Sequence, residues 1–194
     1  MASNPRPDPA AHHVVQSAGR DALAAIHQPG INLAIWQRAV PGDVAAEIAR
    51  LDLCCLPEVR FAAPADALAA PLAAAMAAWG APALLNDVLA LAGDFAAIMA
   101  TPAISVRLEA IAGDACRRWH ADYVTARLIT TYIGPGTDWL PDGAGEGDAR
   151  RLPTGAVAMF KGHGWAPDAP IIHRSPPIAG TGQHRLVLVL NPAA

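Results

Sequence analysis

The stretch RRWHADYVTARLITTYIGPGTDW, residues 117–139, indicates the fold because it joins two potential metal ligands to a β-strand. His120 and Asp122 are two positions apart, so in an extended segment both side chains project from one face. The run ARLITTYI at 126–133 is rich in β-branched and apolar residues, which favours a strand. We therefore expect a strand that begins close to two groups able to share a metal ion.

Short strands are expected throughout the C-terminal part of the chain. In ISVRLEAIA, Ile104, Val106 and Leu108 alternate with polar residues, which is the period of a half-buried strand. Similar runs between glycine- and proline-rich turns occur at 155–162, 170–175 and 185–191, with further candidates at 31–38 and 59–63. Strands at this spacing are typical of a sandwich or a barrel.

The N-terminal half is expected to be mainly helical. PGDVAAEIARL predicts a helix with Asp43 as its N-cap. The alanine-rich segment 67–85 carries no charge and has the length of a membrane span, but Pro71, Gly80 and Pro82 divide it. Proline suits a first helical turn and glycine a C-terminal cap, so the segment predicts two short packed helices and no membrane partner.

Length, charge and cysteine content limit the class of protein. A chain of 194 residues with a net charge of -3 fits one domain and offers no basic surface for nucleic acid. Three cysteines, of which Cys54 and Cys55 are adjacent, form no disulfide framework or zinc knuckle, so we expect buried thiols in a reducing cytoplasm. Residues 1–12 predict a disordered tail, 13–102 a mainly helical support, and 103–194 a β-core with the metal site.

A third metal ligand and a cation follow downstream. His173 ends an apolar run, and two imidazoles with one carboxylate form the triad that holds non-haem Fe(II) with positions left open. Arg185 opens an apolar strand, where a guanidinium is costly to bury unless it binds an anion such as a dicarboxylate co-substrate. The alternatives are a surface histidine near a turn aspartate for the first pair, and an ion pair for Arg185.

The order of these residues resembles that of a known superfamily. His120 and Asp122, the pattern R-x-x-T-x-x-x-G-x-G-T at 127–137, then GAVAMF, HRSPP and Arg185 resemble the Fe(II)/2-oxoglutarate-dependent oxygenases. RLITTYIGPGTDWLP, AMFKG, HRSPP and PGINLAIWQR are together similar to a bacterial domain-of-unknown-function family, DUF1826, over most of the chain. The resemblance implies an α+β fold in which N-terminal α-helices support a C-terminal double-stranded β-helix, a jelly-roll or cupin-like barrel.

The resemblance also implies roles for individual residues. Three residues match the iron ligands: His120, Asp122 and His173. Arg185 matches the residue that binds the distal carboxylate of 2-oxoglutarate, and three hydroxyls would complete that site: those of Thr130, Tyr132 and Ser175. The implied protein is an oxygenase that uses Fe(II), 2-oxoglutarate and O2 to hydroxylate a small molecule or a peptide or protein side chain.

A non-catalytic zinc-binding or metal-homeostasis protein on the same barrel is the alternative. His163 or His184 would supply the fourth ligand of a closed tetrahedral zinc site. Lys161 would pair with Asp122 or replace Arg185 as an anion site. Arg185 discriminates between the two functions, because a zinc holder does not need a buried dicarboxylate site.

Further expectations concern the surroundings of the metal. The candidate pocket walls are Trp119, Trp139 and Trp165. The glycine-rich, acidic segment 134–153 is expected to be a flexible lid. Because Arg127 and Tyr132 lie on opposite faces of one strand, Arg127 is expected to matter less for co-substrate binding.

Overall fold

The computed structural model describes residues 12–193 as a mixed α+β structure. The helices are η1 (Arg20–His27), α1 (Gly42–Ile48), η2 (Ala65–Ala67), α2 (Ala69–Ala75), η3 (Ala77–Trp79), α3 (Pro82–Met99) and η4 (Glu146–Asp148), where η denotes a 3-10 helix. The strands are β1 (Val14–Ser17), β2 (Leu33–Trp36), β3 (Val59–Pro64), β4 (Ala103–Ile111), β5 (Ala126–Ile133), β6 (Asp138–Pro141), β7 (Arg150–Arg151), β8 (Val157–Lys161), β9 (Ile171–Arg174) and β10 (Arg185–Pro192). The predicted α+β class is confirmed.

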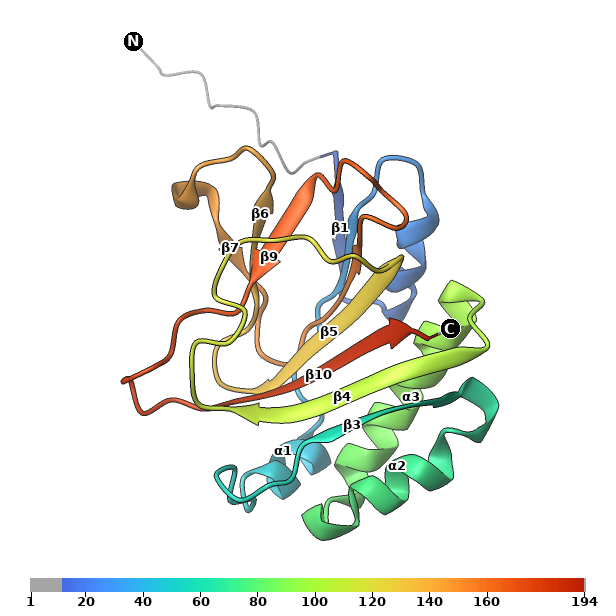
Figure 1. Cartoon of the computed structure of the whole chain (residues 1–194), viewed down its shortest axis with the longest axis vertical. Coiled ribbons are helices and arrows are strands. Elements are labelled where there is room, and N and C mark those ends of the chain that lie inside the picture. Colours follow the sequence, from blue (N-terminus) through green and yellow to red (C-terminus); the bar gives the residue numbers. More distant parts are fainter. Residues whose placement is uncertain (1–11, 194) are drawn as a thin grey trace.

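The strands form two sheets. A seven-stranded sheet has the order β1-β2-β8-β5-β10-β4-β3, and a three-stranded sheet has the order β7-β6-β9. All pairs are antiparallel except β1 with β2. An isolated bridge between His120 and His173 adds the segment before β5 to the edge of the smaller sheet. Figure 1 shows β6, β7 and β9 grouped on the side of the molecule away from α2 and α3.

The central strands of the larger sheet, β8, β5 and β10, are buried on both faces, which explains why they are so apolar. One face packs on the helices through a core that includes Leu84 and Phe95 of α3 and Leu128 of β5. The other face packs against the smaller sheet through a second core that includes Ile129 and Val187. Successive residues of a strand point to opposite faces, so neighbouring residues such as Leu128 and Ile129 enter different cores.

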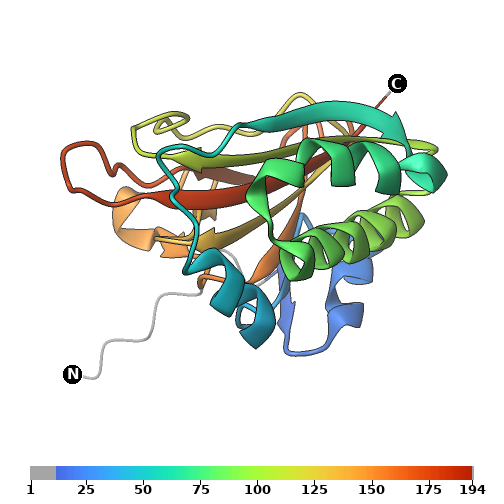
Figure 2. The same ribbon diagram turned by 90° about the horizontal axis from the view of Figure 1, so that it is seen from below.

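Helix α3 is the main support of the sheet. Its buried residues Leu84, Val88, Leu91 and Phe95 recur at the spacing of one helical face. Gly80, at φ 58°, ends the preceding turn in the left-handed conformation that glycine adopts readily, and Pro82 begins α3, as predicted. By length and composition α3 is a helix that would suffice to cross a membrane. Figure 2 shows α2 and α3 lying side by side against the sheet.

The structure corrects several expectations about local structure. The segment 134–153 is not one irregular lid: it contains β6, η4 and β7, because its apolar residues are buried in the smaller sheet. The strand candidates at 31–38 and 59–63 are present as β2 and β3, and β1 is an additional strand that was not predicted. Cys54 and Cys55 are exposed rather than buried. Pro41, not Asp43, is the N-cap of α1. The predicted disordered tail at 1–12 lies outside the described residues except for His12.

Candidate metal centre

Three potential metal ligands converge where the segment before β5 meets β9. One ligand atom from each of His120, Asp122 and His173 lies within 4.8 Å of the others. Nε2 of His173 is 3.2 Å from Oδ2 of Asp122, and Nε2 of His120 is 3.7 Å from Oδ1. The two imidazole centroids are 4.7 Å apart. The structure therefore brings together the three residues that the sequence nominated.

A backbone contact determines which nitrogen of His120 faces this cluster. Nδ1 of His120 is 2.8 Å from the carbonyl oxygen of Arg118. A carbonyl can only accept, so Nδ1 carries the proton and Nε2 presents its lone pair to the other ligands. A hydrogen bond of this kind orients many metal-binding histidines.

Asp122 is held in place by an arginine. Nη1 of Arg127 donates to Oδ1 of Asp122 at 2.5 Å, and Nε of Arg127 donates to Oδ1 of Asn191 at 2.8 Å. Burial opposes ionisation of Asp122, but the contact with His173 and the charges of His173, Arg127 and His120 lower its pKa overall. The carboxylate is therefore ionised, which is the form that binds a metal.

His173 is the buried member of the cluster, with 4% of its surface exposed. Burial lowers its pKa, against the raising effect of Asp122, so the imidazole is neutral at neutral pH. The ring of Phe160 packs on it at a centroid distance of 4.7 Å. A neutral, immobilised imidazole is ready to act as a ligand.

The donor set fits a non-haem iron site. Oδ2 of Asp122 is buried without a hydrogen-bond partner, an arrangement that costs stability unless another group, such as a metal ion, binds there. Within the described residues, the group contains two histidines and one carboxylate and no fourth ligand. Two imidazoles and a carboxylate leave neighbouring coordination positions open, as in iron oxygenases, whereas structural zinc takes four protein ligands.

Arg185 is a buried cation whose hydrogen-bond acceptors are all neutral. It is 1% exposed. Its Nε donates to the carbonyl of Pro135 at 2.7 Å and its Nη1 to the hydroxyl of Ser175 at 2.8 Å. Its Nη2 lies 3.3 Å from the hydroxyls of both Thr131 and Thr137. The guanidinium is thus well oriented, but no carboxylate hydrogen-bonds to it within the described chain.

Burial lowers the pKa of Arg185 to about 10, and the charge of Asp138 offsets only part of this effect. The side chain therefore stays charged at neutral pH at a cost in folding free energy. The turn after β5 approaches it closely: a Cβ on Gly134 would lie 3.2 Å from Cγ of Arg185 and 2.2 Å from the carbonyl oxygen of His184. This position requires glycine, which also allows its φ of 79°.

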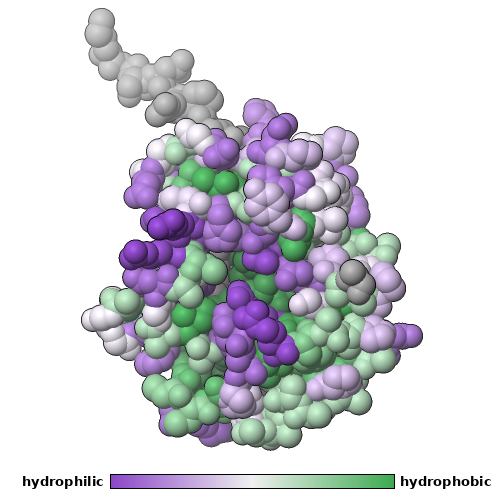
Figure 3. All heavy atoms as spheres, in the orientation of Figure 1, coloured by the Kyte–Doolittle hydropathy of each residue, from purple (hydrophilic) through white to green (hydrophobic). Residues whose placement is uncertain are grey.

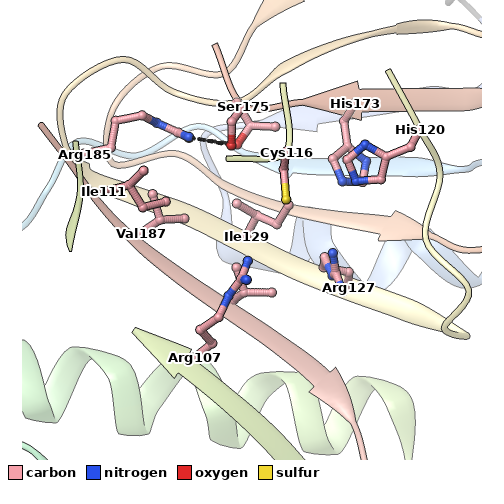
Figure 4. Close-up of a pocket in the computed structure, with 12 residues that line it drawn as sticks. Arg107, Ile111, Cys116, His120, Arg127, Ile129, His173, Ser175, Arg185 and Val187 are labelled. Carbon is pink, nitrogen blue, oxygen red and sulfur yellow. Dashed lines mark hydrogen bonds between the residues drawn. The ribbon is translucent and has the colours of Figure 1, made fainter. Parts of the chain in front are cut away.

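One pocket contains both the imidazoles and Arg185. Figure 4 shows His120 and His173 together at one end and Arg185, bonded to Ser175, at the other. The remaining lining residues are Arg107, Ile111, Cys116, Arg127, Ile129, Thr137, Val187 and Val189. In the orientation of Figure 1, Figure 3 shows strongly hydrophilic side chains over β4 and β10 with hydrophobic surface around them. The pocket is thus a cationic site with aliphatic walls.

Thr130 and Tyr132 do not join Ser175 in this pocket. They lie on the helix-facing side of β5, where Tyr132 donates to Asp87 at 2.6 Å and Thr130 to the carbonyl of Gly155 at 3.4 Å. The expectation that they lie beside Arg185 with Ser175 is therefore wrong, because the alternate residues of β5 face the pocket. The hydroxyl of Thr131 contacts Arg185 instead.

The other predicted contributors also lie outside the cluster. His163 bonds the Pro167 carbonyl at 2.9 Å, and His184 lies 3.5 Å from the Cys54 sulfur. Lys161 packs over Trp165 at 4.7 Å, and partial burial lowers its pKa.

None of the three tryptophans proposed as walls lines the pocket in the described structure. Trp139 is in the core between the sheets, and Trp119 stacks under Arg174 at 4.2 Å. The aliphatic part of the wall comes instead from Ile111, Ile129, Val187 and Val189.

Arg127 contributes more to the site than its sequence position indicates. It faces away from Tyr132, as predicted, but that face of β5 is the one that borders the pocket. Arg127, Ile129 and Thr131 share one face of the strand by alternation, but the opposite face also mixes apolar and polar residues, and a strand buried on both sides gives no polarity contrast to choose between them. Arg107 likewise lines the pocket and was not proposed for it.

Comparison with solved structures shows a similar fold. A crystal structure of the dioxygenase for auxin oxidation from rice has 16% sequence identity and a TM-score of 0.52, over 94% of this chain and 83% of that chain. A Pseudomonas putida prolyl-4-hydroxylase has 16% identity and a TM-score of 0.47, over 88% and 90%. An Arabidopsis thaliana dioxygenase for auxin oxidation has 9% identity and a TM-score of 0.48, over 80% and 73%. None of the curated proteins compared with the chain matches it in sequence.

Sequence comparison with protein families gives a match over nearly the whole described chain. The matched family is described as "Protein of unknown function (DUF1826)", and the match covers residues 17–191, from β1 to β10. It includes the three potential ligands, Arg185 and the helices that support the sheet. The chain therefore belongs to the DUF1826 family, and its fold resembles that of the rice dioxygenase.

Proposed function

We propose that the chain is an Fe(II)- and 2-oxoglutarate-dependent oxygenase that hydroxylates a small molecule or a peptide or protein side chain. One observation carries the proposal: an open three-ligand cluster shares a pocket with a buried arginine whose hydrogen-bond acceptors are all neutral. The cluster suits Fe(II), and Arg185 suits the distal carboxylate of a dicarboxylate. Together they match the two ends of 2-oxoglutarate.

The strand arrangement supports a double-stranded β-helix as the scaffold. In the larger sheet β8, β5, β10 and β4 are successive neighbours. In the smaller sheet the order is β7, β6, β9 and then the segment that contains His120. The two groups of four face each other across the core that includes Ile129 and Val187. The similar fold of the rice dioxygenase agrees with this arrangement.

Each residue would have a defined task. His120, Asp122 and His173 would hold the iron, which when bound supplies the activation of O2 coupled to oxidative decarboxylation of 2-oxoglutarate. Arg185 would bind the distal carboxylate and so direct the 2-oxo end toward the three ligands. Arg127 would keep Asp122 ionised and oriented.

The reaction would convert a substrate C–H bond into C–OH. It consumes one O2 and one 2-oxoglutarate and releases succinate and CO2, so that one oxygen atom enters each organic product. The aliphatic side chains of Ile129, Val187 and Val189 would exclude water from this pocket.

Anaerobic titration of the Fe(II) protein with 2-oxoglutarate tests the proposal. We expect the weak visible charge-transfer band of a chelated 2-oxo acid. Arg185→Ala should weaken 2-oxoglutarate binding by roughly tenfold or more, because each charge-assisted hydrogen bond contributes about 1.5–3 kcal/mol. Arg185→Lys should recover part of the affinity, since an ammonium lacks the planar fork.

Arg60→Ala is the matched control, because Arg60 is an exposed arginine on β3 paired with Glu58 at 2.6 Å. Its affinity for 2-oxoglutarate should equal that of the unmodified protein. If 2-oxoglutarate produced neither a band nor measurable binding, the assignment would fail and a non-catalytic metal-binding function would replace it.

A further inference from the structure

Arg107 lies in the pocket without a role in the tasks assigned above. It projects from β4, the strand next to β10, where it is the register partner of Val189. Its side chain is 27% exposed, so it borders both the pocket and the solvent. Figure 4 shows its guanidinium directed toward the interior, on the side of Cys116 and Arg127.

The terminal nitrogens of Arg107 are free, unlike those of the other two arginines that line the pocket. Its Nε lies 3.4 Å from Oε1 of Glu109, and within the described chain its Nη1 and Nη2 have no hydrogen-bond partner. Arg127 is engaged by Asp122 and Asn191. Arg185 has an acceptor for each of its nitrogens. Arg107 therefore presents the two-pronged edge that matches a carboxylate.

The charges around the pocket favour one further anion. Burial lowers the pKa of Arg127 most, and the charge of Asp122 raises it. The positive charge of Arg107 lowers the pKa of Arg127 further, which means that the two guanidiniums repel each other. Three arginines and a divalent metal outweigh the charges of Asp122, Glu109 and a doubly charged 2-oxoglutarate by one positive charge. Asp138 near Arg185 does not change this balance, because it is paired with Arg151 at 2.6 Å. A singly charged ligand at Arg107 would balance the site and relieve this repulsion.

We propose that Arg107 binds the carboxylate of the primary substrate, and that this substrate is a small organic acid with an apolar body. The inference rests on the proposed function, which places the reacting centre at the three ligands. Val189, the register partner of Arg107, and Ile129, the register partner of Val189, supply aliphatic surface beside Arg107. A carboxylate fits better than a phosphate, because Glu109 already neutralises part of the charge and would repel a dianion.

This arrangement would orient the substrate by its two ends. The carboxylate remains at Arg107, near solvent, while the apolar body extends along the aliphatic wall toward His120 and His173. The hydroxylated carbon would then be remote from the carboxyl group rather than part of it. Anchoring a charged group away from the reacting atom is a common way to position a substrate.

Binding of simple acids to the anaerobic Fe(II) protein saturated with 2-oxoglutarate tests the inference. The probes are butyrate and benzoate, each compared with its neutral amide, and inorganic phosphate, with affinities measured by calorimetry. At least one acid should bind about tenfold more tightly than its amide, as expected for charge-assisted hydrogen bonds. Arg107→Gln should reduce that affinity to the level of the amide and leave 2-oxoglutarate affinity within about twofold.

Arg60→Gln is the matched control. Arg60 is the register partner of Arg107 on β3, has the same charge, and is exposed and paired with Glu58. It should leave acid binding unchanged, which separates a direct contact from a general effect of charge.

The inference is overturned if neither acid binds, if acids and amides bind equally, if Arg107→Gln binds the acid normally, or if phosphate binds more tightly than both acids. A loss of 2-oxoglutarate binding in Arg107→Gln would also overturn it, by assigning Arg107 to the co-substrate. The charge-transfer band of the unmodified protein reports on the proposed function separately. Its absence contradicts that function, whereas its presence without acid selectivity contradicts this inference alone.

Discussion

His173 has the most demanding position of the three ligands, because it combines burial with close approach to Asp122. Burial keeps its imidazole neutral, and its Nε2 faces the carboxylate at 3.2 Å. The remaining ligands, His120 and Asp122, come from one short segment and cannot surround an ion on their own. His173 thus joins the two parts of the proposed metal site.

We expect His173→Ala to abolish tight Fe(II) binding. Removing a side chain that only orients a metal ligand typically lowers metal affinity by about 10–100-fold. Removing a ligand itself should lower the affinity by at least this factor. Chelator competition under anaerobic conditions measures the effect. His163→Ala should bind Fe(II) normally, because its Nδ1 is bonded to the Pro167 carbonyl outside the cluster. Full metal occupancy in His173→Ala would remove this residue from the site.

Strand β5 separates two polar systems that lie only one residue apart. Tyr132 faces the helices and donates to Asp87, which also forms an ion pair with Arg38 at 2.7 Å. Thr131 faces the pocket and contacts Arg185. The first system joins the sheet to α3, and the second belongs to the proposed co-substrate site.

Substitutions at these two neighbours should therefore have different effects. Tyr132→Phe removes a hydrogen bond to a charged acceptor, which should cost about 1.5–3 kcal/mol of unfolding free energy in urea titration. It should leave 2-oxoglutarate affinity unchanged. Thr131→Val should weaken 2-oxoglutarate binding, because one of the groups that orients Arg185 is lost. Weaker 2-oxoglutarate binding in Tyr132→Phe would restore that residue to the site.

Burial of the charged Arg185 side chain lowers the stability of the folded protein as a whole. Its pKa is lowered to about 10, so the folded protein holds an incompletely compensated cation between the two sheets. A ligand carboxylate that binds Arg185 only in the folded state removes that cost and stabilises the fold by linkage.

Thermal unfolding of the metal-loaded protein should accordingly depend on 2-oxoglutarate. At a ligand concentration about 100 times Kd, the gain of about 2.7 kcal/mol corresponds to a Tm increase of roughly 5–10 °C for a chain of this size. Arg185→Met, of similar bulk and without charge, should show little increase when calorimetry is repeated. An equal increase in both proteins would place the 2-oxoglutarate site elsewhere.

The sequence by itself determined the long strands of the larger sheet and nominated the residues of the candidate metal cluster. The patterns at 104–112, 126–133 and 185–191 are long enough to indicate strands from local chemistry alone, and they form β4, β5 and β10. His120 and Asp122 share a face because the side-chain period of a strand is two residues. The helix pair around Gly80 followed from the conformational preferences of glycine and proline.

Only the tertiary structure decided which face of β5 borders the pocket. Both of its faces are buried, so Arg127 and Thr131 cannot be distinguished from Thr130 and Tyr132 by local polarity. The choice depends on where α3 and the smaller sheet pack, and those contacts join residues far apart in the chain. For the same reason the free edge of Arg107 became visible only once β4, β5 and β10 were placed side by side.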